Sequence, residues 1–135
     1  MEYVTFAPEH LAGVLRLTAA EGWHSLADDA DRAVRALTAP GVYVVVATDG
    51  TQVAGFAHAL SDGLVVTYLA SLIVGAEYRR RGVARQLVTE LFRRTGAWRM
   101  DLLAEEAAEG FYRTFAHRTK PGYRIYPPGA AAPPG

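Results

Sequence analysis

The spacing of apolar residues predicts two helices in the first part of the chain. Apolar side chains recur every three or four positions until Gly22 interrupts them, which is the period of one helix face and predicts a helix over residues 8–20. A second, shorter helix is expected over residues 28–38, where acidic residues lie in the first turn and Pro40-Gly41 follows the last.

Beyond these helices the pattern changes to the β-branched and aromatic runs that are typical of strands. Residues 42–47 and 53–60 flank Asp49-Gly50, a strong hairpin signal, and predict an antiparallel hairpin. The nearly continuous apolar run over residues 64–74 predicts a central strand that is buried on both faces.

Helical spacing returns in the second half and alternates with strand-like runs. The predicted elements are a helix over 82–95, a strand over 98–103, a helix over 105–116 and a short strand over 123–126. With a short strand before the first helix, this order predicts an α/β fold in which about four helices flank one mixed sheet.

Composition and length limit the classes of protein that fit. A chain of 135 residues suits one domain, which we expect over residues 1–127, and the Pro-, Ala- and Gly-rich residues 128–135 suit a disordered tail. The 14 basic and 14 acidic side chains cancel, which disfavours nucleic acid or an anionic membrane as partners. No signal peptide or membrane-spanning run is visible, so a cytoplasmic location is expected.

Cysteine is absent from the sequence. Its absence excludes disulfides, thiolate zinc sites and a cysteine nucleophile, and we expect no bound metal. If the protein transfers a chemical group, the transfer therefore does not pass through a thiol of the chain.

The segment from Tyr78 to Arg85 carries the clearest chemical signal. It lies between a predicted strand that ends at Val74 and a helix that opens at Gly82. A glycine lets the backbone come close to a ligand, a helix N-terminus offers unpaired N–H groups, and the arginines supply positive charge. These features predict a phosphate site, with a solvated turn as the alternative.

Two other phosphate motifs do not fit. A dinucleotide-binding fingerprint requires Gly-x-Gly-x-x-Gly, and a P-loop requires Gly-Lys-Ser/Thr. Neither motif occurs in this sequence.

The run Arg79-Arg-Arg-Gly82-Val-Ala84 resembles the acyl-CoA-binding signature of the GNAT acetyltransferase superfamily, Gln/Arg-x-x-Gly-x-Gly/Ala, at every fixed position. The resemblance implies a GNAT fold, acetyl-CoA as the acyl donor, and direct transfer of the acetyl group to a primary amine of a small molecule. It also implies that the cofactor is held at the end of the central strand and along the loop, by Leu72, Ile73, Val74, Arg79, Arg80, Arg81, Gly82, Val83, Ala84 and Arg85.

The resemblance also suggests the acid and the base. Phe111-Tyr112 is similar to a family motif whose tyrosine protonates the departing thiolate, so Tyr112 is the candidate general acid, with a packed core tyrosine as the alternative. Tyr68 stands where many members carry a glutamate or histidine base. His58 is the first candidate for that role, and the other candidates are a water relay, Glu21, His24 and His117.

Trp23 and His24 lie where family members build the wall of the acceptor pocket, and Tyr68 is a further pocket candidate. A core position for Trp23 is the alternative. Two other functions remain open: a non-catalytic acyl-CoA sensor, and acetylation of proteins or peptides. The resemblance is also compatible with a homodimer.

Overall fold

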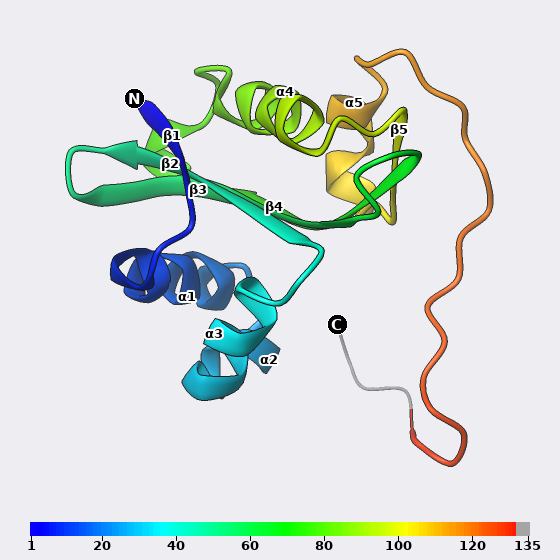
Figure 1. The fold of residues 1–135 in the computed structure, drawn as a ribbon, viewed down its shortest axis with the longest axis horizontal. Helices are drawn as coiled ribbons and strands as arrows, with labels where there is room; N and C mark the ends of the chain where they lie inside the picture. The colour runs from blue at the N-terminus through cyan, green and yellow to red at the C-terminus, as the bar shows by residue number, and fades with distance from the viewer. Residues whose placement is uncertain (132–135) are drawn as a thin grey trace. The chain divides into compact units, whose positions relative to one another are not determined.

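The structure is a computed structural model that describes residues 1–131 (Figure 1). The chain packs as two compact units, Met1–Asp101 and Leu102–Gly135. None of the helices in the described residues is long and apolar enough to cross a membrane.

A mixed sheet of five strands, in the order β1-β2-β3-β4-β5, forms the frame of the first unit. The strands are β1 (Glu2–Thr5), β2 (Val42–Asp49), β3 (Gln52–Ser61), β4 (Val66–Val74) and β5 (Arg99–Leu102). Neighbours from β1 to β4 are antiparallel. β5 begins beside Val65, whose carbonyl oxygen accepts hydrogen bonds from the N–H groups of Trp98 and Arg99. Because a helical crossover returns the chain from the end of β4 to this point, β5 runs parallel to β4.

The predicted hairpin is confirmed, with its turn one residue later than expected. Asp49 still pairs with Gln52, so the two turn residues are Gly50 and Thr51. Gly50 has a φ of 61°, a left-handed conformation that glycine adopts without steric cost.

Helices cover both faces of this sheet. One face packs against α1 (Leu11–Ala20) and α3 (Ala30–Leu37), and the other against α4 (Val83–Thr95) (Figure 1). These three helices confirm the predictions from apolar spacing. A single-turn helix, α2 (His24–Ala27), was not expected. The buried cluster on the α1–α3 side consists of Phe6, Val14, Leu17, Leu37, Val44, Val46, Val53, Phe56 and Ile73.

The prediction that β4 is the central strand, buried on both faces, is wrong. β3 is the middle strand and is almost entirely buried, whereas buried and exposed residues alternate along β4. Tyr68 and Ala70 are exposed. The apolar run hid this alternation because alanine and tyrosine are tolerated on a half-open face.

A bulge interrupts the pairing of β3 with β4. His58 pairs with Ser71, but Ala59 pairs with Leu69, so Ala70 has no partner. An extra residue of this kind moves the following side chains to the opposite face of the strand. The bulge lies in the middle of β4 and faces the part of β3 that holds His58.

The second unit contains little regular structure. After η3 (Glu106–Ala108) and the short helix α5 (Glu109–Tyr112), no helix or strand occurs up to residue 131. The predicted helix over 105–116 is therefore too long: the N–H and the hydroxyl of Thr114 both bond to the carbonyl of Phe111, which tightens the turn and ends the helix.

The predicted strand over 123–126 is not formed, because no neighbouring strand pairs with it in the described structure. The predicted disordered tail extends past the described residues: its last part, 132–135, lies outside them. Residues 128–131 contain only a turn at Pro128-Gly129.

Candidate functional site

The loop between β4 and α4 is fixed to the first unit by the side chains at its start. Tyr78, in the short helix η2 (Ala76–Tyr78), is buried and donates its hydroxyl to Asp49 Oδ2 at 3.0 Å. Arg79 donates from Nε to the carbonyl of Val74 at 3.2 Å and from Nη2 to Glu21 Oε1 at 2.9 Å. The loop is thus tied to β2, to the end of β4 and to the end of α1.

Beyond these ties the backbone leaves a row of amides open. The first hydrogen bond of α4 runs from Gln86 N–H to the carbonyl of Gly82, at 3.0 Å, and the N–H groups at the start of a helix have no acceptor within the helix itself. Among the described residues, no backbone acceptor is recorded for five consecutive N–H groups, those of Arg80, Arg81, Gly82, Val83 and Ala84.

The shape of the loop depends on two left-handed residues. Gly82 has a φ of 76° and caps α4, and Arg80 has a φ of 64°, which is uncommon for a residue with a side chain. A Cβ added at Gly82 would meet no atom within 4 Å. Space is therefore free beside the open amides, and a strained backbone of this kind is typical of a ligand site.

Positive charge is concentrated where the loop meets the N-terminus of α4. No acidic residue lies in the first turn of α4, and the helix dipole adds positive potential there. The guanidinium of Arg81 lies over the ring of Tyr78, 5.5 Å from its centre, while Arg80 and Arg85 are exposed. The arrangement suits an anion with more than one negative charge.

The end of β4 adds further open backbone groups. β4 has nine residues and its parallel neighbour β5 only four, so the last part of β4 extends beyond β5. Gly75 N–H bonds to Ala54 on β3, and because the direction of backbone groups alternates along a strand, those of Leu72 and Val74 face away from β3. The side chain of Ile73 is buried in the core. Because Arg79 takes the carbonyl of Val74, the groups left for a ligand are the backbone groups of Leu72 and the N–H of Val74.

A pocket of about 240 Å³ lies between α1 and the end of β4. It brings three of the predicted cofactor-binding residues, Ile73, Val74 and Arg79, together with the end of α1. Its lining contains two arginines and two glutamates among apolar residues: Arg16, Leu17, Ala20, Glu21, Ile73, Val74, Gly75, Ala76, Glu77 and Arg79.

The bulge brings a second group of side chains together. His58 pairs with Val44, which belongs to the core cluster on the α1–α3 side, so His58 lies on that face of the sheet. Its other cross-strand partner is Ser71, and Tyr68 lies on the same face, opposite Leu60. Tyr68 is 37% exposed. This part of the face is therefore only partly covered.

His58 itself is half-buried, and no hydrogen-bond partner within the described residues is recorded for its ring. Loss of hydration on burial lowers the pKa of His58 below its ordinary value of 6.5. The imidazole is therefore neutral near neutral pH and can accept a proton.

The residues expected in the wall of the acceptor pocket differ in how deeply they are buried. Trp23 is half-buried and packs against the core cluster, whereas His24 is exposed. Glu21 is held by Arg79 rather than free. His117, in the second unit, is exposed and its Nδ1 lies 2.8 Å from the carbonyl oxygen of Phe115.

Tyr112 lies in α5 of the second unit. It is half-buried, and its ring packs edge-on against Phe111, with 5.1 Å between the ring centres. Burial raises the pKa of Tyr112 above its ordinary value of 10.0. Its hydroxyl therefore keeps its proton over the neutral range.

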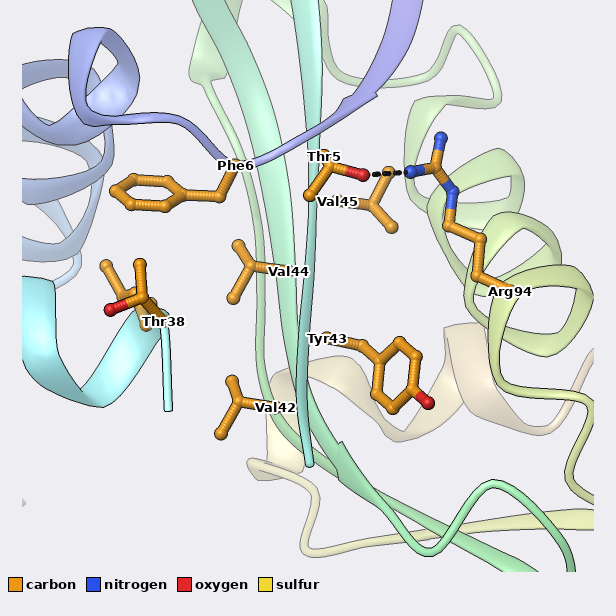
Figure 2. A pocket seen from close by; sticks show the side chains of 9 residues that line it. Thr5, Phe6, Thr38, Val42, Tyr43, Val44, Val45 and Arg94 are labelled. Carbon is orange, nitrogen blue, oxygen red and sulfur yellow. Dashed lines mark hydrogen bonds between the residues drawn. The ribbon is translucent and has the colours of Figure 1, made fainter. Parts of the chain in front are cut away.

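Another pocket, of about 280 Å³, lies at the edge of β2 and contains none of the predicted site residues. Figure 2 shows Phe6, Val42 and Val44 on one side of it and Arg94 on the other, where Arg94 donates to the Thr5 hydroxyl at 2.8 Å. The carboxylate of Glu90 also contacts Arg94, at 3.4 Å. The positive charge in this pocket is therefore already paired.

The comparison with protein families decides the classification. The sequence model of the GNAT acetyltransferase domain matches residues 40–115, which include the hairpin, β4, the loop and α4. The chain belongs to the GNAT acetyltransferase family. A search of curated proteins finds no significant match.

Solved structures show the same GNAT fold at low identity. A GNAT family acetyltransferase from Streptococcus pneumoniae TIGR4 is 24% identical, with a TM-score of 0.73 over 96% of this chain and 97% of that one. The aminoglycoside 6'-N-acetyltransferase AAC(6')-IG from Acinetobacter haemolyticus is 16% identical, with a TM-score of 0.77 over 97% and 100%. AAC(6')-Iy, solved with a CoA bisubstrate analogue, is 21% identical, with a TM-score of 0.76 over 96% and 98%.

These comparisons confirm the predicted family and fold class. They leave the individual site residues of this GNAT protein as predictions. Two contacts of the site were not predicted from the sequence. Glu21 is the ion-pair partner of Arg79, and Ser71 is the cross-strand partner of His58. Neither contact has a local sequence signal, because each joins distant parts of the chain.

Proposed function

We propose that this GNAT protein is an acetyl-CoA-dependent N-acetyltransferase that transfers the acetyl group directly to a primary amine of a small molecule. The observation that carries the proposal is the row of five open amides from Arg80 to Ala84, at the N-terminus of α4. Backbone N–H groups at a helix N-terminus favour phosphate, and the pyrophosphate of acetyl-CoA is such a ligand.

The residues of the site fit acetyl-CoA in charge and in shape. The loop amides and the guanidinium groups of Arg80, Arg81 and Arg85 would hold the pyrophosphate, and the free space beside Gly82 allows close approach. The backbone groups of Leu72 and the N–H of Val74 would hold the polar part of the acyl arm. Bound acetyl-CoA supplies an acetyl group activated as a thioester.

Two side chains would move the protons. An amine is protonated at neutral pH and must lose a proton before its nitrogen can attack a carbonyl. The neutral imidazole of His58 would accept that proton, and Ser71, its cross-strand neighbour, would lie beside it. The hydroxyl of Tyr112 would give a proton to the departing thiolate, a role that rests on the family resemblance of Phe111-Tyr112.

The absence of cysteine supports direct transfer. Without a cysteine, the protein has no thiol on which an acetyl group could be carried, so the amine and acetyl-CoA would be bound together. In the proposed ternary complex the exposed edge of the α1–α3 face, with Tyr68, Trp23 and His24, would receive the amine.

A small-molecule amine is the proposed acceptor because one solved neighbour is named an aminoglycoside 6'-N-acetyltransferase and another is solved with the bisubstrate analogue CoA-S-monomethyl-acetylneamine. The carboxylate of Glu77 in the pocket beside β4 would attract an ammonium group.

A thiol-release assay with acetyl-CoA and a panel of small primary amines tests the proposal. We expect turnover with at least one amine, a fall in kcat on the order of 100-fold for Tyr112→Phe, and little change for Tyr123→Phe as a matched control. Binding of acetyl-CoA without turnover on any amine would support a non-catalytic sensor instead. Acetylated lysines or N-termini in a peptide library, without small-molecule turnover, would support a protein acetyltransferase.

A further inference from the structure

The two sides of His58 along its strand differ in how they are covered. Phe56 and Leu60 share the face of His58, because alternate residues of a strand point the same way. Phe56 is fully buried, and its cross-strand partners Val46 and Ile73 belong to the same core cluster. On the side of Phe56 the face is therefore closed by packing.

On the other side of His58 the face is open. Leu60 lies there, two residues further along β3, and is 45% exposed. Its cross-strand partners are Val42 on β2 and Tyr68 on β4, and Figure 2 shows Val42 on the same side of β2 as Val44. Side chains directly opposite each other in a sheet are in contact. Val42, Leu60 and Tyr68 therefore form a continuous apolar row across three strands of the first unit.

The apolar row is partly anchored and partly open to water. Val42 packs against the core cluster, as does Trp23 from the connection after α1. Leu60 and Tyr68 keep much of their apolar surface exposed. Contiguous apolar surface of this kind is typical of a binding site, and here it lies next to the proposed base.

Charged groups on this face lie away from the apolar row. Asp62 follows β3, and its Oδ1 accepts hydrogen bonds from three backbone N–H groups of the next turn, at 2.8–3.1 Å. That carboxylate is therefore engaged in the turn. Glu77 lies in the pocket that Ile73 lines, on the closed side of His58. Attraction for an ammonium group is thus at one end of the face, and apolar surface is at the other.

This arrangement limits the shape of an acceptor. If His58 takes the proton of the amine, the nitrogen must lie beside its imidazole. The rest of the acceptor cannot extend toward Phe56, where the face is packed, so it extends over the apolar row. The distance along β3 from His58 to Leu60 is about 7 Å, which one aromatic ring on a short alkyl chain would cover.

We propose that the acceptor is a primary monoamine with an apolar body, an aralkyl or alkyl amine, and that Val42, Leu60 and Tyr68 bind that body. The proposal rests on the acetyl transfer proposed above. The ammonium group gives one proton to His58, and its nitrogen bonds to the acetyl carbon as the C–S bond breaks. A second proton from the nitrogen balances the one that the thiolate takes up, so the products are an amide and the CoA thiol.

The same surface disfavours a polycationic acceptor such as an aminoglycoside. Each further ammonium group would lie over the apolar row with no carboxylate beside it, and a charge that loses water without gaining a partner is costly. The chain would therefore differ in its acceptor from the aminoglycoside 6'-N-acetyltransferase that shares its fold.

A thiol-release assay with three amines tests the preference. The kcat/KM for 2-phenylethylamine should exceed that for ethanolamine about 10- to 100-fold, which is the gain from burying one ring, and neamine should be no better than ethanolamine. A higher kcat/KM for neamine or ethanolamine would overturn the inference and leave the proposed acetyl transfer intact. No turnover on any amine would overturn both.

Substitutions in the apolar row connect the preference to these residues. Leu60→Asp should lower kcat/KM for 2-phenylethylamine about tenfold, raise it for neamine, and leave the affinity for acetyl-CoA unchanged. Leu64→Asp is the matched control, at a leucine that is 70% exposed in the neighbouring turn. Tyr68→Phe keeps the ring and should retain the preference, whereas Tyr68→Ser should reduce it. A preference that neither Leu60→Asp nor Tyr68→Ser changes would contradict the inference.

Binding can be measured apart from turnover. On titration with 2-phenylethylamine, the methyl signals of Leu60 should shift and saturate, while those of Leu64 stay in place; unmoved Leu60 signals would count against the inference. Sedimentation velocity tests a different occupant. If the wild type is a dimer that Leu60→Asp dissociates without changing the amine preference, a second copy covers the apolar row and the inference is wrong.

Discussion

The loop from Tyr78 to Ala84 and the segment Tyr123–Tyr126 have similar compositions and opposite surroundings. Both contain tyrosine and arginine, and both have a local pattern that predicts a defined conformation. Tyr78 is 6% exposed and hydrogen-bonded to Asp49, while Tyr123 is 83% exposed. A local pattern therefore folds as predicted where the rest of the chain supplies partners, and forms no helix or strand where it does not.

The difference extends to the backbone. In the loop, Arg80 and Gly82 hold left-handed conformations, and strain of this kind persists only where surrounding contacts impose it. The ties of Tyr78 and Arg79 are those contacts. The loop can therefore keep its amides open before a ligand arrives, which reduces the entropic cost of binding.

The largest predicted effect comes from the same substitution in both regions. Tyr78→Ala removes a buried ring and should lower the free energy of unfolding by about 3–5 kcal/mol. Tyr123→Ala, at a side chain that is 83% exposed, should change it by less than about 0.5 kcal/mol. Urea denaturation of the two variants measures both values. Equal losses would contradict the contrast between the regions.

Next in size is the effect of filling the space beside the open amides. Gly82→Leu places a side chain where the ligand would approach and should weaken acetyl-CoA binding on the order of 100-fold, through the loss of one or two charge-assisted hydrogen bonds. Gly50→Leu is the matched control, because Gly50 also has a positive φ and free space around its Cα. Calorimetric titration should show normal affinity for the control. Equal affinities for both variants would argue against a backbone site.

A smaller effect should separate the arginines of the loop. Arg79→Ala cuts the side-chain bonds to Val74 and Glu21 and should weaken acetyl-CoA binding about tenfold, since each lost hydrogen bond contributes about 1 kcal/mol. Arg80→Gly removes an exposed charge but suits the left-handed backbone, so a loss of about threefold is expected. The same titration ranks the two variants, and the reverse order would show that charge matters more than loop shape.

The smallest predicted effect is a pH dependence of protein stability, which comes from His58 on the α1–α3 face of the sheet. The folded-state pKa of His58 lies below 6.5, so between the two values the unfolded chain binds more protons than the native state. The stability that depends on neutral His58 is fully present above pH 6.5 and is lost as the pH falls through the folded-state pKa of His58. Thermal melting at pH 5 and pH 7 should show this loss, and His58→Gln should reduce it.

The same titration should appear in catalysis if His58 is the base. The acid limb of kcat/KM would then have its inflection below pH 6.5, because only the neutral imidazole accepts a proton. An acid limb that is unchanged in His58→Gln would assign the role to another group.

The sequence predicts those parts of the molecule whose signals are local. Gly82 and Gly96 delimit α4, and Asp49-Gly50 predicts the hairpin to within one residue. The motif also predicts the row of amides from Arg80 to Ala84, because a helix N-terminus leaves such groups unpaired whatever the rest of the chain does.

The remaining features depend on contacts between distant residues. The bulge at Ala70, which brings Ser71 opposite His58, follows from how β3 and β4 align, and the partner of Arg79 lies 58 residues away, at Glu21. The pattern of 123–126 predicts a strand that does not form in the described structure, where no neighbouring strand pairs with it. In each case the pattern specifies a tendency and tertiary contacts decide the outcome.

The central claim is that the backbone of the loop holds acetyl-CoA, and amide chemical shifts of the ¹⁵N-labelled protein test it most directly. On titration with acetyl-CoA, the N–H signals from Arg80 to Ala84 should shift most and saturate, while those from Tyr123 to Tyr126 stay in place. Absence of a saturable shift in the loop, or larger changes elsewhere with the loop signals unmoved, would contradict the account.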